Sequence, residues 1–300
     1  MRLKAIYKDK SSTNKIGILF LIVLLSVFFV SLIALGITNV FFNDLSNSLT
    51  VNYLENSSYI NYLKLMQLFS AVGLFILPIL IYSYLTGFDL NFRNVRRQNI
   101  LLVFAIMLLI PPFISLLLEW NMQIQVPNFF RYFDRDTEEL VKAFLKMDNI
   151  WDLLYTLLVV AVIPALGEEL FFRGYLQKKI GVFLKNSHLS IIITSFLFSA
   201  IHLHFHGLIP RFVLGMLLGY LFLWSRSLWV PILAHFINNA LAIIFAYPLF
   251  KLESGSYSLF SEEKVDPKIA LISLISVLLL LFLFHKNAKK KVLKSPFYNE

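Results

Sequence analysis

Eight mostly apolar stretches, each about 20 residues long, constrain the fold of this chain more than any other feature. They cover residues 16–37, 64–86, 100–118, 151–172, 188–204, 207–224, 228–247 and 268–285. A helix needs about 20 apolar residues to cross the hydrocarbon core of a bilayer. The chain is also 58% hydrophobic and only 15% charged, whereas soluble domains are about one quarter charged. The sequence therefore predicts an all-α fold, a polytopic membrane helical bundle of about eight transmembrane helices.

The positively charged residues predict the orientation of this bundle. They gather in the N-terminal segment, in two loops and in the tail: Arg2, Lys4, Lys8, Lys10, Lys15, Arg93, Arg96, Arg97, Lys178, Lys179, Lys185, Lys286, Lys289, Lys290, Lys291 and Lys294. All of these positions fall on one side of an eight-span arrangement, and cytoplasmic loops carry an excess of Lys and Arg. The alternate segments carry more acid, as in Asp134, Asp136, Glu138, Glu139, Glu262, Glu263 and Asp266. We therefore expect an integral protein of the cell (plasma) membrane with both termini in the cytoplasm.

The net charge of +9 does not indicate nucleic acid, because the positive residues lie at the ends of apolar stretches as a membrane protein requires. The lysine-rich tail is predicted to contact anionic lipid head groups. The apolar run after the basic N-terminus is about twice as long as the core of a signal peptide, so we interpret it as a retained anchor. The chain contains no cysteine, which excludes disulfides, thiol catalysis and thiolate metal sites.

Residues 119–150 form the only sizeable polar segment between apolar stretches. Leu140, Val141, Phe144 and Leu145 recur at helical spacing within it. Two interpretations remain open: an amphipathic helix that lies at the membrane interface, and a solvated connector that packs on the bundle.

Two adjacent glutamates lie inside the apolar stretch at 151–172, and an arginine follows directly after it. Glu169 and Arg173 are four residues apart, so on a helix they share one face and can neutralise each other. Glu168 points about 100° away around the helix axis and needs another partner. An ionisable residue inside a membrane segment indicates a functional site by default, and such a carboxyl group can act as a general base.

The next stretches add histidines and an amide. Phe198 precedes His202 by four residues, and His235 precedes Asn239 by four. His204 and His206 follow directly and are assigned to the membrane interface. Gly215 and Gly219, also four residues apart, predict close approach of a neighbouring helix. Glu168, His202, His235 and Asn239 would be four costly buried polar groups without a packing role, which favours chemistry over scaffold.

These side chains supply the kinds of chemical group that hydrolysis requires. Glu168, helped by His202, could deprotonate water for attack on a carbonyl, while His235 and Asn239 could donate hydrogen bonds to the oxyanion that develops. The sequence lacks both a Gly-x-Ser-x-Gly nucleophile motif and a His-Glu-x-x-His zinc motif.

The motifs Glu168-Glu169-x-x-x-Arg173, Phe198-x-x-x-His202 and His235-x-x-x-Asn239, in this order on separate stretches, resemble those of the CPBP family. This family contains the CAAX prenyl-protease and Abi (bacteriocin-processing) intramembrane endopeptidases. The resemblance covers about residues 150–245. It implies a helical core with a recessed active site that opens toward the cytosol, and hydrolysis of peptide bonds in membrane-associated peptides or proteins.

Carried over from the resemblance, Glu168 and His202 activate water, His235 and Asn239 form the oxyanion hole, and Glu169 with Arg173 supports Glu168 structurally. The family is described both as metalloproteases and as metal-free glutamate proteases. No cofactor is certain; Zn²⁺ is possible on nitrogen and oxygen ligands, although Asn239 would be an unusual ligand.

The resemblance divides the chain into three parts. Residues 1–150 hold N-terminal membrane helices with the amphipathic connector, 151–247 the CPBP/Abi-type catalytic core, and 248–300 the C-terminal helix and basic tail. Two other functions remain open for the same polar core: a non-catalytic membrane binding or immunity protein, and a proton-coupled transporter. The sequence lacks the paired broken helices in two related halves that many transporters show.

Overall fold

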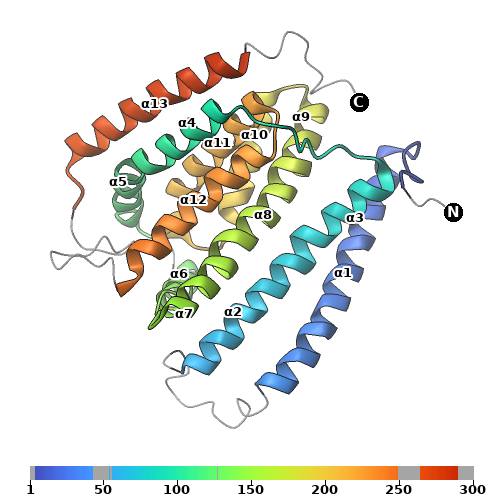
Figure 1. Ribbon diagram of the computed structural model, residues 1–300, viewed down its shortest axis with the longest axis horizontal. Helices are drawn as coiled ribbons and strands as arrows, with labels where there is room; N and C mark the ends of the chain where they lie inside the picture. Colours follow the sequence, from blue (N-terminus) through green and yellow to red (C-terminus); the bar gives the residue numbers. More distant parts are fainter. Residues whose placement is uncertain (1–3, 43–53, 55, 127, 249–263, 290–300) are drawn as a thin grey trace.

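The apolar stretches form helices, as Figure 1 shows for a computed structural model that describes residues 4–42, 54, 56–126, 128–248 and 264–289. No strand occurs among these residues. The α-helices are α1 (Ser12–Phe41), α2 (Ser57–Ala71), α3 (Leu77–Thr86), α4 (Arg97–Leu109), α5 (Pro111–Met122), α6 (Asn128–Phe144), α7 (Ile150–Thr156), α8 (Ile163–Glu169), α9 (Lys178–Leu184), α10 (Ser187–Ala200), α11 (Leu208–Ser225), α12 (Trp229–Ala246) and α13 (Pro267–Lys289). Three π-helical segments, η3 (Val72–Ile76), η4 (Leu157–Val162) and η5 (Leu170–Gln177), and the 3₁₀ turn η6 (Phe205–Gly207) complete the set.

Among the described residues, six helices are long and apolar enough to cross a membrane, or seven if the bent pair α4 and α5 forms one span. The helical bundle predicted from hydropathy is confirmed. One of the eight apolar stretches, 188–204, differs from expectation because its helix α10 has 14 residues. Such a helix is about 21 Å long, short of the roughly 30 Å hydrocarbon core. The chain turns after α10 and returns as α11, which packs along it.

Prolines lie where three of the spans bend or change helix type. Pro111 begins α5, and α4 and α5 meet there at a bend of 42°. Pro78 and Pro164 lie at the starts of α3 and α8, and each follows a π-helical segment. Proline cannot donate to the preceding turn and its ring crowds that turn, so a wider turn before it relieves the clash without ending the span.

The predicted close approach at Gly215 and Gly219 is present between α11 and α10. A Cβ atom added at Gly219 would lie 2.8 Å from a side-chain carbon of Ile191, and one at Gly215 would lie 3.0 Å from the Cβ of Ser195. Any larger residue would push the two helices apart. The two helices on either side of the loop after His202 are therefore packed closely.

The basic segments meet at one end of the bundle. Lys178 Nζ donates to Asn91 Oδ1 at 2.7 Å, and Arg96 Nη1 donates to the carbonyl of Asn287 at 3.4 Å. The N-terminal segment joins them, since the amide of Ala5 donates to the carbonyl of Tyr84. The residues predicted to face one side of a membrane therefore lie together. The lysines after residue 289 and the acids Glu262 and Glu263 lie outside the described residues.

The polar connector forms α6, which packs on the bundle at the end opposite to the basic segments (Figure 1). Its residues Ala143 and Phe144 are buried against Ile60. Its other face is exposed and charged, as at Arg135 and Asp136. This packing agrees with the connector interpretation of residues 119–150.

Candidate active site

Glu168 and Glu169 end α8 in the middle of the long span that runs from α7 to α9. The span contains two π-helical segments, η4 before the glutamates and η5 directly after them. A π-helical segment widens the helix and redirects the side chains that follow it, and such segments are frequent at functional sites.

Glu169 and Arg173 form the ion pair expected from their spacing. Arg173 Nη1 lies 2.8 Å from Glu169 Oε1, and both side chains are completely buried. Arg173 Nη2 donates to the carbonyl of Gly215 at 3.0 Å, and the guanidinium carbon lies 4.7 Å from the ring centre of Phe198. The arginine therefore neutralises Glu169 and joins its own span to α10 and α11.

His235 contacts both glutamates. Its Nδ1 lies 2.9 Å from Glu169 Oε1, and its Nε2 lies 3.9 Å from Glu168 Oε2. The carboxylate of Glu169 accepts hydrogen bonds, so Nδ1 carries the proton in this contact. Glu169 thus fixes the orientation of the imidazole and turns Nε2 toward Glu168. Glu168 itself has 13% of its side chain exposed, whereas that of Glu169 has none.

His202 lies in the turn after α10. Its Nδ1 lies 2.9 Å from the carbonyl oxygen of Phe198, and because a carbonyl can only accept, Nδ1 carries the proton and Nε2 presents a lone pair. The ring of Phe198 contacts both histidines, at 5.4 Å from the ring centre of His202 and 5.8 Å from that of His235. Phe198 therefore packs against both imidazoles.

Asn239 lies one turn beyond His235 on α12. Its Nδ2 donates to the carbonyl of Val160 in η4 at 3.0 Å, and its Oδ1 accepts from Asn238 at 3.1 Å. Among the described residues, one amide hydrogen of Asn239 makes no hydrogen bond and could be donated to a ligand. The structure brings Glu168 and His235 into contact, and Phe198 packs against both His235 and His202. Asn239 instead makes its hydrogen bonds with Val160 and Asn238.

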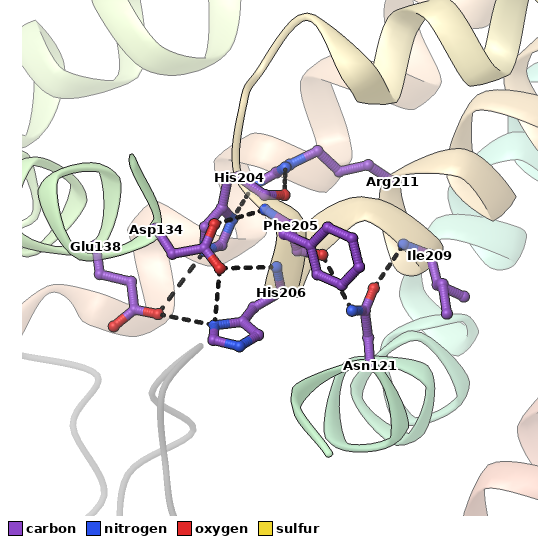
Figure 2. Close-up of polar contacts among 8 residues, drawn as sticks. All are labelled: Asn121, Asp134, Glu138, His204, Phe205, His206, Ile209 and Arg211. Carbon is purple, nitrogen blue, oxygen red and sulfur yellow. Dashed lines mark hydrogen bonds and ion pairs between the residues drawn. The ribbon is translucent and has the colours of Figure 1, made fainter. Parts of the chain in front are cut away.

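The loop that follows His202 is held from outside the motif-bearing helices, as Figure 2 shows. Asp134 of α6 is 3% exposed and accepts from the amides of Phe205 at 2.5 Å and His206 at 3.3 Å. Its Oδ2 also lies 3.1 Å from Nδ1 of His206. Leu203 adopts a left-handed backbone with φ of 51°, a conformation that costs energy for a residue with a branched side chain. The bonds to Asp134 offset this strain next to His202.

A second side chain holds the same loop from α5. Asn121 Nδ2 donates to the carbonyl of Phe205 at 3.0 Å, and Asn121 Oδ1 accepts from the amide of Ile209 at 2.7 Å (Figure 2). Asn121 is fully buried. The loop after His202 is therefore fixed at both ends of its 3₁₀ turn.

Arg211 of α11 was not anticipated from the sequence. Its guanidinium donates to the backbone carbonyl of His204 at 3.2 Å. It also lies 2.5 Å from Nδ1 of the His204 imidazole (Figure 2). It is also close enough to Glu168 and His202 for their charges to interact. His204 and His206, which the sequence assigns to the membrane interface, lie close to Glu138 of α6, and His206 also to Asp134.

Zn²⁺ is the one metal that the sequence left possible at these residues. Glu168, His202 and His235 lie in one region, but across the described ranges no three His, Asp or Glu side chains are arranged so that they could hold a metal ion. The described residues as arranged therefore do not fit a metal centre.

The segment that carries these residues is similar to known proteins. Residues 150–241 match the family model described as type II CAAX prenyl endopeptidase Rce1-like. The predicted resemblance to the CPBP family is confirmed. The Rce1-like segment begins at α7 and ends within α12, so it contains all three motifs, while Asn121 and Asp134 lie outside it.

A curated relative is the uncharacterized protein YpbD of Bacillus subtilis (strain 168). It is 30% identical over 117 residues, which are 37% of this chain and 57% of YpbD. The matched part of the chain thus spans little more than half the length of this relative. No solved structure gives a significant match.

Proposed function

We propose that the protein is an intramembrane endopeptidase that hydrolyses peptide bonds of membrane-associated peptides or proteins. The observation that carries this proposal is the contact between Glu168 and His235, 3.9 Å apart in a buried polar region of the Rce1-like segment. An incompletely paired carboxylate beside two imidazoles can activate water and stabilise negative charge. CAAX-type prenylated proteins are one substrate class to test, because the matched family is described by that activity.

In the proposed reaction, Glu168 takes a proton from a water molecule whose other hydrogen is donated to Nε2 of His202, and the water oxygen bonds to the carbonyl carbon of the substrate. The carbonyl oxygen becomes an oxyanion, which accepts hydrogen bonds from Nε2 of His235 and Nδ2 of Asn239. The tetrahedral intermediate then collapses, the C–N bond breaks, and the proton held by Glu168 passes to the leaving amine. The products are a free amine and a carboxylic acid, which then loses its proton to solvent and becomes a carboxylate.

This mechanism sets a condition on His235. Its Nδ1 already carries a proton toward Glu169, so Nε2 can donate to an oxyanion only when the ring carries both protons. Removal of one oxyanion donor typically lowers the catalytic rate constant about 10²- to 10³-fold.

The experiment that tests the function compares the termini of membrane proteins in cells that express the wild type or Glu168→Ala. New protein termini that occur only with the wild type would identify substrates and cleavage sites. A protease of this kind predicts a small set of such termini, whereas identical termini in both cell lines would contradict the proposal. If the Glu168→Ala cells keep the phenotype of the wild-type cells although no cleavage occurs, a non-catalytic role would be favoured instead.

Asp134 offers a test of how the His202 loop is held. We expect Asp134→Ala to lower kcat about 10- to 100-fold with little change in KM, because it frees the loop and lets His202 shift, and displacements of about 1 Å can cost that much. Asp134→Asn keeps an oxygen that accepts from the amide of Phe205 and should recover most of the rate. Kinetics with a substrate found as above would measure both.

The control for Asp134 is Asp136→Ala, because Asp136 lies on the same helix with 70% of its side chain exposed. It should leave kcat within about twofold of the wild type. Equal kcat values for the Asp134→Ala variant and this control would show that α6 does not position His202.

A further inference from the structure

Arg211 lies on the face of α11 that packs against the span of the two glutamates. Gly215 and Gly219 follow it on this face at intervals of four residues. The carbonyl of Gly215 accepts a hydrogen bond from Arg173 Nη2 at 3.0 Å. One turn later, the carbonyl of Gly219 accepts from Gln177 Nε2 at 3.2 Å. The two helices therefore run side by side in the same direction, and Arg211 lies at the level of the glutamates, which precede Arg173 by about one turn.

A glycine one turn before Arg211 makes room for its guanidinium. A Cβ atom added at Gly207 would lie 2.6 Å from Nη2 of Arg211 and 2.7 Å from its Cζ. The backbone of Gly207 has φ of −97°, and a negative φ does not require glycine. The guanidinium that lies against this position, and not the backbone conformation, therefore explains why a side chain does not fit there.

Two contacts with His204 fix the direction of the guanidinium (Figure 2). Nη1 donates to the backbone carbonyl of His204 at 3.2 Å, and Nη2 lies 2.5 Å from Nδ1 of its ring. A guanidinium can only donate, so Nδ1 accepts and the proton of the imidazole is on Nε2. This Nε2 lies 3.7 Å from Glu138 Oε1 of α6. Arg211 is thus bound to the loop that begins at His202.

The guanidinium also brings a second positive charge to the glutamates. Arg173 forms its ion pair with Glu169, at 2.8 Å. Arg211 interacts electrostatically with Glu168 and with Asp134 of α6. A carboxylate that is buried in a membrane segment is costly unless another charge compensates it. The second arginine therefore has a physical reason to lie beside the second glutamate.

We infer that Arg211 is a further positioning residue of the active site, which supplies a counter-charge to Glu168 and, through His204, holds the loop of His202 in place. This inference rests on the proposed hydrolysis, because it assigns a role within the same site. An opposite charge nearby favours the charged form of a carboxyl group, and only that form can accept a proton from water.

A double-mutant cycle on thermal unfolding of the full chain in detergent tests the counter-charge without any substrate. Arg211→Gln removes the positive charge and should lower the unfolding temperature. In the Glu168→Gln background one of the two carboxylates that face Arg211 is neutral, so the loss should be at least about 2 °C smaller. Equal losses in both backgrounds would overturn the counter-charge. The control background is Glu139→Gln, with 51% of that side chain exposed, and there the loss should equal that in the wild type within about 1 °C.

Kinetics of three variants test the positioning role. Arg211→Gln should lower kcat about 10- to 100-fold with little change in KM, because small displacements of catalytic groups cost that much. Arg211→Lys keeps the charge but forms fewer hydrogen bonds, so it should recover part of the rate. Equal kcat values for these two variants, or a kcat of Arg211→Gln within about twofold of the wild type, would overturn the inference.

Gly207→Ala is the third variant, because it displaces the guanidinium without removing it. It should lower kcat in the same way, and combining it with Arg211→Gln should add little further loss, since both changes remove the same contact. Full additivity would show that Gly207 does not act through Arg211. The matched control is Gly36→Ala on α1, where an added Cβ atom would meet no atom of the described chain within 4 Å.

Failure of the inference and failure of the proposed function give different results. If the wild type cleaves no peptide, the proposed function fails, while the unfolding cycle still decides whether Arg211 compensates Glu168. If the wild type cleaves its substrate but the unfolding cycle shows no coupling, the inference fails and the proposed function stands.

Discussion

Replacing Glu168 by glutamine is expected to lower the rate of peptide-bond cleavage by about 10²- to 10⁴-fold, the usual contribution of a general base. The amide is nearly the same size as the carboxyl group and keeps an acceptor toward Nε2 of His235, 3.9 Å away. It cannot take a proton from water. Because Glu168 is the less tightly paired glutamate, the variant should unfold at nearly the same temperature as the wild type. Rates on a membrane-tethered reporter and thermal unfolding in detergent measure both quantities.

The matched control is Glu139→Gln, which makes the same chemical change on α6 at a side chain with 51% exposure. It should leave the rate within about twofold. A rate for Glu168→Gln within that same range would contradict the role of Glu168 as base. Loss of activity together with a large fall in unfolding temperature would show that Glu168 is structural.

Local patterns in the sequence predicted the parts of this structure that depend on nearby residues. Hydropathy predicted the helices, and the four-residue spacing predicted the pair of Glu169 with Arg173, present at 2.8 Å. The same spacing predicted close packing at Gly219. In each case the partners lie on one helix, or the signal is a property of one helix face.

Local sequence patterns could not predict the contacts between distant segments. Asp134 and Phe205 are 71 residues apart, and nothing in the composition of residues 119–150 indicates that an acid there holds the loop after His202. The contact of Glu169 with His235 was equally unforeseen, because the spacing assigned Glu169 to Arg173 alone. His202 and His235 lie on separate helices, and only the packing of Phe198 against both rings shows that they are near each other.

The second large effect is expected at Arg173, and it should fall on stability. Arg173→Met removes the positive charge from a completely buried ion pair and leaves Glu169 uncompensated, which costs about 3–5 kcal/mol in comparable cases. It also removes the donor to the carbonyl of Gly215, 3.0 Å away. The unfolding temperature in detergent should therefore drop by far more than in Glu168→Gln.

The double variant Arg173→Met/Glu169→Gln tests the reason for that loss. Glutamine removes the buried negative charge but keeps an oxygen that accepts from Nδ1 of His235, so the double variant should be more stable than Arg173→Met alone. Recovery of this kind is the signature of a buried charge pair, because removal of both charges costs less than removal of one. If the double variant is instead less stable than the single one, the arginine acts by packing on Phe198 and through Gly215. In that case charge neutralisation would not explain why an arginine lies buried beside the two glutamates.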